Sequence, residues 1–173
     1  MTPPQYPVGP HEPVAIPDDA RRREWIAQIE EAPARLRAAV ADLTDAQLDT
    51  PYKNWTIRQI VHHLADSHAN SYVRFKLALT EDQPTIKPYD EARWAALADS
   101  RTGDVAAPLA LLEGLHAQLL QLLRTLKPEQ FVRTFYHPES QSVVALNDAL
   151  SYYAWHGRHH TGQILWLRQA KGW

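Results

Sequence analysis

Residues 152–165 read YYAWHGRHHTGQIL, and this stretch decides how the rest of the chain is understood. Within it, His156 and His160 stand four residues apart, about one helical turn, so their imidazoles project from the same face. The surrounding apolar residues recur at helical spacing and both histidines fall within that stripe, whereas His159 lies on its flank. The pattern predicts a helix over about 146–168 that carries two imidazoles into the interior of a helical bundle.

A second group of histidines, in HHLADSH at residues 62–68, lies on another predicted helix, which begins after Thr56 and ends near residue 79. Periodicity favours His68 as its inward residue over His62 and His63, so spacing alone does not select a third partner for the other two imidazoles. Three imidazoles from two helices, in a chain without cysteine, are typical of a zinc or nickel site with an open position.

Two further helices complete an all-α, single-domain four-helix bundle spanning residues 1–173. One begins at Asp18 or Asp19, and Pro33 within it predicts a kink or a break near Glu30. The other spans about 106–126.

The segments between the predicted helices are long. Residues 1–19 contain six prolines and should form an extended arm. Thr44 and Gln47 form a capping box for a short turn. The connection over 80–104, with a turn at 90–97 anchored by Trp94, is long enough to serve a function or cover a site. Residues 129–145 should form an irregular or hairpin-like return.

Composition excludes several classes of protein. A net charge of −2 without a basic tract argues against nucleic acid and anionic membranes as partners. The amino-terminal sequence lacks the apolar core of a signal peptide, and no apolar run approaches the roughly 20 residues of a membrane span. We therefore expect a cytoplasmic protein. Because the chain has no cysteine, any thiol chemistry must use a thiol from the substrate.

Other interpretations of the polar residues stay open at this level. Inward histidines can be core residues bonded to backbone or tyrosine, and Asp66 can either orient an imidazole or lie solvated. Glu113 and His116 form one Glu-x-x-His pair, but a di-iron bundle needs two. The residues near the histidine clusters in sequence do not single out a general base among Asp66, Tyr72, Tyr153 and Arg158.

Four segments carry a resemblance to a known family: WTIRQIVHHLADSHANSYVRFKLALTE at 55–81, KPYDEARWAALADS at 87–100, FYHPES at 135–140 and YYAWHGRHH at 152–160. From about residue 6 to 173 the chain resembles the YfiT-like metal-dependent hydrolases of the DinB superfamily, which includes bacillithiol transferases. The resemblance implies a homodimeric four-helix bundle with one zinc or nickel ion per subunit. It assigns His63, His156 and His160 as ligands, and Gln163 stands where the family often has a further histidine.

The resemblance implies a metal-dependent hydrolase acting on a small molecule, with neither nucleic acid nor a membrane as partner. Three neutral imidazoles leave an ion able to activate water for attack on a carbonyl. The first alternative is a low-molecular-weight thiol S-transferase of the bacillithiol type, in which the ion binds the sulfur of a small thiol. The second is a non-catalytic metal-binding bundle, which a fourth protein ligand would indicate.

Overall fold

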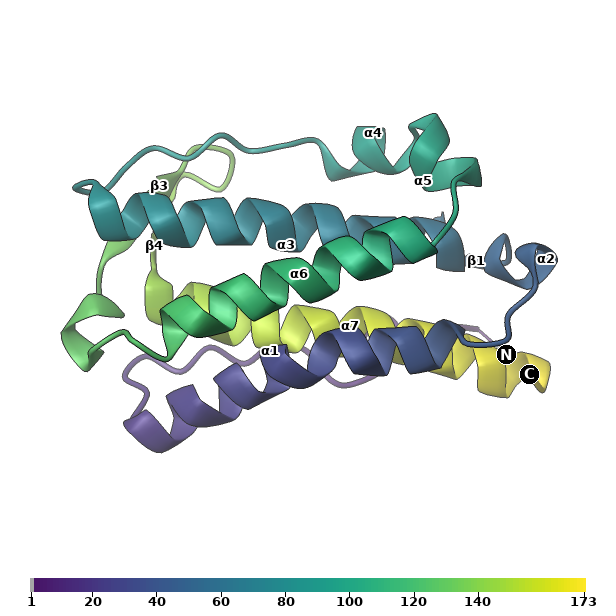
Figure 1. Cartoon of the computed structure of the whole chain (residues 1–173), viewed down its shortest axis with the longest axis horizontal. Helices are drawn as coiled ribbons and strands as arrows, with labels where there is room; N and C mark the ends of the chain where they lie inside the picture. Colours follow the sequence, from purple (N-terminus) through teal and green to yellow (C-terminus); the bar gives the residue numbers. More distant parts are fainter. Residues whose placement is uncertain (1) are drawn as a thin grey trace.

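The computed structural model describes residues 2–173 and shows the expected four-helix bundle (Figure 1). Its long helices are α1 (Asp19–Val40), α3 (Ile57–Thr80), α6 (Ala106–Leu123) and α7 (Leu146–Lys171). The shorter elements are α2 (Asp45–Leu48), β1 (Pro51–Tyr52), β2 (Trp55–Thr56), α4 (Glu91–Ala95), α5 (Ala98–Thr102), a 3-10 turn at Pro128–Gln130, β3 (Thr134–His137) and β4 (Ser142–Ala145).

The four long helices pack as two parallel pairs. The sequence colours of Figure 1 show α1 and α7 running in one direction and α3 and α6 in the other. Helix α1 packs against α7 and α6, and α3 packs against the same two helices from the other side. The chain therefore needs one connection that runs back along the bundle, from α3 to α6, whereas α6 and α7 are joined at one end; both connecting segments contribute to the site described below.

The helix boundaries follow from the local chemistry of their ends. Thr56 caps α3 and Gln59 reaches back to the Thr56 backbone, a complete capping box, and Thr44 with Gln47 repeats the motif at α2. At the carboxyl-terminal end of the bundle sequence, α7 continues to Lys171, three residues beyond the prediction. It ends there because Gly172 adopts the left-handed conformation, with φ of 75°. Helix α6 ends at Leu123, three residues earlier than predicted.

Of the kink or break predicted near Glu30, the break is absent, because α1 runs without interruption from Asp19 to Val40. Pro33 is buried inside this helix and has no N–H to donate to the carbonyl of Ile29. The Nδ1 atom of His116 on α6 lies 2.6 Å from that carbonyl oxygen and bonds it instead. A side chain from a neighbouring helix thus satisfies the carbonyl that the proline leaves without its helical partner.

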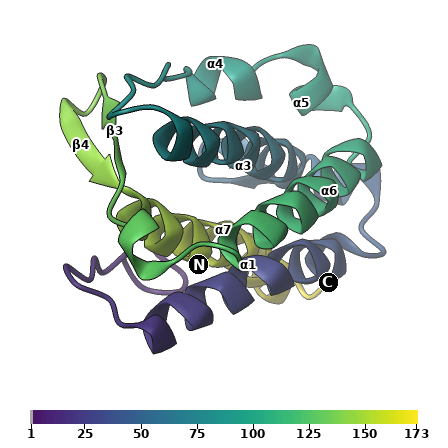
Figure 2. The same ribbon diagram turned by 60° about the vertical axis from the view of Figure 1, so that its left-hand side comes forward.

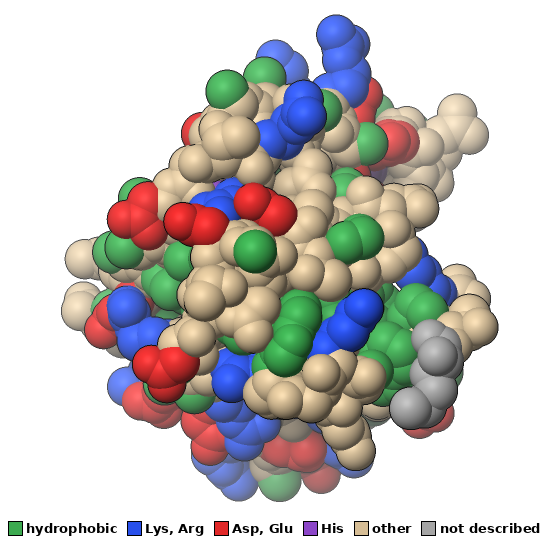
Figure 3. Space-filling model, turned by 90° about the vertical axis from the view of Figure 1, so that its right-hand side faces the viewer, with side chains coloured by type: hydrophobic (Ala, Val, Ile, Leu, Met, Phe, Trp, Pro, Cys, Tyr) green, Lys and Arg blue, Asp and Glu red, His purple; other side chains and the backbone are tan. Residues whose placement is uncertain are grey.

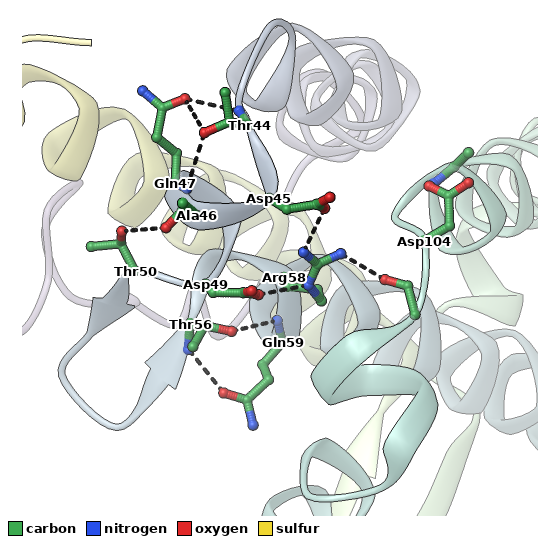
Figure 4. Close-up of polar contacts among 12 residues, drawn as sticks. Thr44, Asp45, Ala46, Gln47, Asp49, Thr50, Thr56, Arg58, Gln59 and Asp104 are labelled. Atoms are coloured by element: carbon green, nitrogen blue, oxygen red, sulfur yellow. Dashed lines mark hydrogen bonds and ion pairs between the residues drawn. The ribbon is translucent and has the colours of Figure 1, made fainter.

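A buried arginine ties the start of α3 to its surroundings (Figure 4). Arg58 is 4% exposed, and its guanidinium donates to Asp49 at 2.7 Å, to Asp45 at 2.8 Å and to the carbonyl of Gly103 at 2.8 Å. These carboxylates raise the pKa of Arg58 above its usual value, so its charge is permanent. The contacts join both ends of α2 and the end of α5 to α3.

The connection between α3 and α6 is partly helical, since α4 and α5 lie over α3 (Figure 2). The prediction of one turn anchored by Trp94 is only partly correct. Trp94 is 40% exposed and packs its ring against Tyr89, whereas Ala95 and Ser100 are the buried residues of α4 and α5. The hairpin of β3 and β4 is antiparallel, as the sequence suggested.

Residues 2–18, in the proline-rich arm, form neither helix nor strand and lie along α7. The indole N–H of Trp155 donates to the carbonyl of Gly9 at 2.9 Å, and the ring of Tyr6 packs against His159. The hydroxyl of Tyr52 donates to the carbonyl of Pro4. The arm therefore covers the face of α7 that the other three long helices leave open.

Helix α6 is, within residues 2–173, the one helix long and apolar enough to cross a membrane by length and composition. In the bundle it packs against α1 and α3, and its polar residues make specific contacts there: Glu113 pairs with Arg37, and His116 bonds the Ile29 carbonyl. These contacts identify α6 as a bundle helix. Figure 3 shows charges of both signs interspersed on the end of the molecule that carries α2 and the carboxyl terminus.

Candidate metal centre

Three buried histidines from two helices converge between α3 and α7. His63, His156 and His160 each offer one ring nitrogen, and these nitrogens lie within 4.8 Å of one another. The Nε2 atoms of His63 and His156 are 3.2 Å apart. Two nitrogens at zinc-binding distance from one tetrahedral ion are separated by about 3.3 Å, so this spacing fits a shared divalent ion.

The hydrogen bonds around His160 fix which of its nitrogens faces the cluster. The amide oxygen of Gln163, which can only accept, lies 2.8 Å from Nδ1 of His160, so Nδ1 carries the proton. The Nε2 lone pair is then free for a ligand. The amide N–H of Gln163 also donates to Nε2 of His159 at 3.0 Å. The residue that departs from the family pattern therefore still orients a histidine.

The cluster is buried and its imidazoles are neutral. His63 and His156 are each 4% exposed and His160 is 8% exposed. Burial lowers the pKa of His63 to about 4, and burial with the neighbouring imidazoles lowers the pKa of His156 and His160 well below the usual value. A neutral imidazole with a free lone pair is the form that binds a metal, so the donor set suits a borderline divalent cation.

An aromatic residue of β2 supports the cluster. The Trp55 ring lies 4.5 Å from that of His63 and 6.3 Å from that of His160, centre to centre. Trp55 immediately precedes the cap of α3, so the capping box that starts this helix also sets the position of the indole.

The remaining histidines of the two motifs lie elsewhere. His62 faces the α5 side, near Asp99 and Arg58, and burial lowers its pKa. His159 stacks on Trp155 at 4.6 Å under the arm. His68 is buried, as periodicity predicted, but its partners are His116 and His156. Glu113 is exposed and paired with Arg37, so the Glu-x-x-His pair does not converge on a shared site.

A cavity of about 1180 Å³ reaches the cluster at His156. Its wall combines segments far apart in the sequence: the arm, α3, the connection before α4, the β3–β4 hairpin and α7. Residues 88–92 belong to the long connection, which therefore lines a cavity as expected. Sequence reasoning missed His11 and His137, which also line it, because neither lies in a periodic segment that would have drawn attention to it.

The four residues considered as general bases differ in position. Tyr153 lines the cavity beside His156, and its hydroxyl accepts a hydrogen bond from Arg74 at 3.2 Å. Burial raises the pKa of Asp66 to about 6, with the nearby Asp99 adding to the shift. Tyr72 and Arg158 do not line the cavity. Only Tyr153 therefore combines contact with the cavity and proximity to the cluster.

Comparisons with known proteins agree with this fold. The DinB superfamily model matches residues 28–164. A Bacillus subtilis (strain 168) protein named "Putative metal-dependent hydrolase YfiT" is 50% identical over 170 residues, covering 97% of this chain and 96% of its own. A relative from Bacillus mycoides (strain KBAB4) with the same description is 47% identical over 171 residues, covering 98% of both chains.

The solved structure of Bacillus subtilis YfiT is similar over nearly its whole length, with a TM-score of 0.95, 50% identity and 97% of each chain covered. It is described as "a probable metal-dependent hydrolase with an unusual four-helix bundle topology". Since the family model spans most of the chain and the relatives are about half identical over nearly all of it, this protein belongs to the DinB superfamily, as one of its YfiT-like members.

Proposed function

We propose that this protein is a metal-dependent hydrolase of a small molecule, with one divalent ion, zinc before nickel, held by His63, His156 and His160. The observation that carries the proposal is the set of three neutral, buried imidazoles whose nitrogens lie within 4.8 Å of one another, beside a large cavity. The description of its relatives as metal-dependent hydrolases supports it.

A divalent ion on three neutral imidazoles supplies Lewis acidity towards water and towards a substrate carbonyl. The chain's own residues supply the surroundings. Tyr153 places a hydroxyl on the cavity wall next to His156. Arg74, the one lysine or arginine that lines this cavity among the described residues, holds that hydroxyl and offers a positive charge to an anionic substrate group. Arg74→Gln should raise KM for anionic substrates more than for neutral ones. An equal change of KM for both kinds of substrate would show that Arg74 does not bind an anionic substrate group.

Metal analysis and an activity screen test the proposal together. Purified protein should contain about one divalent ion per chain, and His160→Ala should lose it, whereas His62→Ala, a buried neighbour outside the cluster, should keep it. Circular dichroism checks that both variants fold. Hydrolysis of esters or amides that disappears with the metal supports the proposal, and full metal occupancy in His160→Ala would overturn the site.

The same screen separates the alternatives. No contact in the structure favours the thiol S-transferase, but activity that requires an added small thiol would establish it in place of hydrolysis. Bound metal without turnover of any tested electrophile would favour the non-catalytic bundle. The proposal also includes a cytoplasmic homodimer. Sedimentation at micromolar concentration tests the dimer, and fractionation of cells tests the location.

A further inference from the structure

Two buried histidines outside the three-residue cluster form a continuous hydrogen-bonded chain with it. His116 on α6 is 1% exposed and His68 on α3 is 2% exposed. Nδ1 of His116 lies 2.6 Å from the Ile29 carbonyl on α1, Nε2 of His116 lies 2.8 Å from Nδ1 of His68, and Nε2 of His68 lies 3.3 Å from Nδ1 of His156 on α7. The chain crosses all four long helices.

The hydrogen-bonded chain of histidines begins at the Ile29 carbonyl, which is available because residue 33 is a proline. In a regular helix the N–H of residue 33 would donate to the carbonyl of Ile29, but proline has no N–H. The carbonyl of Ile29 can therefore accept a full hydrogen bond from another helix, and His116 provides it at short distance. The free carbonyl is a fixed acceptor, because a backbone carbonyl cannot donate.

That fixed acceptor determines the direction of every bond after it. Nδ1 of His116 must carry the proton, so in a neutral ring its Nε2 can only accept. Nδ1 of His68 then donates to His116, and Nε2 of His68 accepts from Nδ1 of His156. His156 is left with its Nε2 lone pair, and this atom lies 3.2 Å from Nε2 of His63 within the cluster.

We propose that His116 and His68 are positioning residues that hold His156 in the tautomer whose Nε2 faces the cluster, with the Ile29 carbonyl as the anchor. The inference rests on the proposed metal site, since His156 is one of its ligands. Metal-bound imidazoles are commonly oriented by an acceptor on the other ring nitrogen. Here the acceptor is a neutral imidazole, and its direction is set two residues away by a backbone carbonyl.

The geometry explains why neutral rings suffice. A carboxylate in place of His68, which is 2% exposed, would bring a negative charge into the interior, whereas the imidazole chain carries none. Burial lowers the pKa of His116 to about 4 and that of His68 well below its usual value, which agrees with neutral rings throughout the chain. The rings of His68 and His116 meet edge to edge in nearly one plane, with centres 4.8 Å apart and planes inclined by 28°, which suits the hydrogen bond between their nitrogens.

The first test reads the tautomers in the metal-free protein, so it does not depend on metal binding or activity. Long-range ¹H–¹⁵N correlation spectra distinguish protonated from unprotonated ring nitrogens. We expect His116, His68 and His156 all to carry the proton on Nδ1. A proton on Nε2 of His156, or a mixture of its tautomers, would overturn the proposal, whatever the metal site or the reaction proves to be.

The second test compares zinc affinity in matched variants, by competition with a chromogenic chelator. His68→Leu removes the acceptor for His156 and should weaken zinc binding by about 10- to 100-fold. His68→Gln keeps one acceptor and one donor and should restore most of the affinity. His116→Leu, two bonds from His156, should give a smaller loss together with mixed His156 tautomers. His62→Leu is the control, since it is buried nearby but outside the chain.

A purely structural role for His68 predicts that the Leu and Gln variants change the melting temperature without separating in zinc affinity. Equal affinities would overturn the proposal. If His68→Leu does not fold, His116→Leu and the wild-type spectra decide. Failure of the wild type to bind zinc would instead remove the proposed function, and the tautomer spectra would still test the chain of hydrogen bonds.

Discussion

Acid should unfold the metal-free protein, because burial holds the imidazoles of its interior in the neutral form. Burial is the main cause that lowers the pKa of His63 to about 4, and the same holds for His116, where the Ile29 carbonyl opposes part of the shift. In the unfolded chain a histidine has a pKa of about 6.5. Below that pH the unfolded state binds protons that the native state excludes, so the free energy of unfolding falls as pH drops from 6.5 towards 4.

The size of the loss follows from the two pKa values. One pKa unit is worth about 1.4 kcal/mol, so each of the two histidines lowers the free energy of unfolding by about 2 kcal/mol between pH 7 and pH 5. Together they remove about 4 kcal/mol. His68, His156 and His160 have their pKa lowered further and act in the same direction. Since a single domain is usually stable by about 5–15 kcal/mol, most of its stability should be lost by pH 5.

Urea unfolding followed by tryptophan fluorescence, at a series of pH values with a chelator present, measures this dependence directly. The carboxyl of Asp66 opposes it, because its native pKa of about 6 lets the folded state take up a proton first. Asp66→Asn should therefore steepen the loss. His116→Gln should reduce the slope by about one proton, and His137→Asn, on the cavity wall, should change it far less. A free energy of unfolding that differs by less than about 1 kcal/mol between pH 7 and pH 5 would refute the reasoning.

Three further outcomes follow from the same contacts. Adding zinc to metal-free protein should raise its melting temperature, since binding favours the folded state alone, and an unchanged value at full occupancy would show that the ion contributes nothing to the fold. Arg58→Met should lower the free energy of unfolding by about 2–4 kcal/mol. The loss is smaller than for a pair in which both partners are buried, because Asp45 and Asp49 are largely exposed. As the control, Arg35→Met removes an exposed pair with Glu31 and should cost less than about 0.5 kcal/mol. His62→Ala and His159→Ala should keep most of the metal and most of any hydrolysis, and loss of the ion in either variant would reassign the ligands.

The sequence predicted the bundle well because its helices are long and their signals are local. The apolar stripes of α3 and α7 correctly located the helices that carry the cluster, and the capping box at Thr44 correctly located α2. Boundaries failed where the last turns are set by tertiary contacts, as at the carboxyl-terminal ends of α6 and α7. Helix α5 was missed because a five-residue helix has too few turns to show periodicity.

Pro33 predicts a kink or a break near Glu30, but α1 continues through this position for a reason that no local rule contains. A proline inside a helix normally costs about 3 kcal/mol, partly through the carbonyl it leaves without a partner. The partner comes from His116, 87 residues away in the chain. Local sequence rules also could not select His63 as the third histidine of the cluster. Periodicity correctly indicated that His68 is inward, but His63 is inward too, and only the packing of α3 on α7 brings His63 to the other two.

Pro33 and the cluster are parts of one arrangement, although they lie on different helices and share no contact. The proline frees the Ile29 carbonyl, and a free carbonyl in a buried helix needs a donor. His116 can donate only if its other nitrogen accepts, and this requirement passes through His68 to His156. Any residue with an N–H at position 33 would offer the carbonyl a second donor and weaken the bond that sets the direction of the chain. The orientation of His156 on α7 is thereby determined by the backbone N–H that α1 lacks at Pro33. This dependence arises only when all four helices are packed.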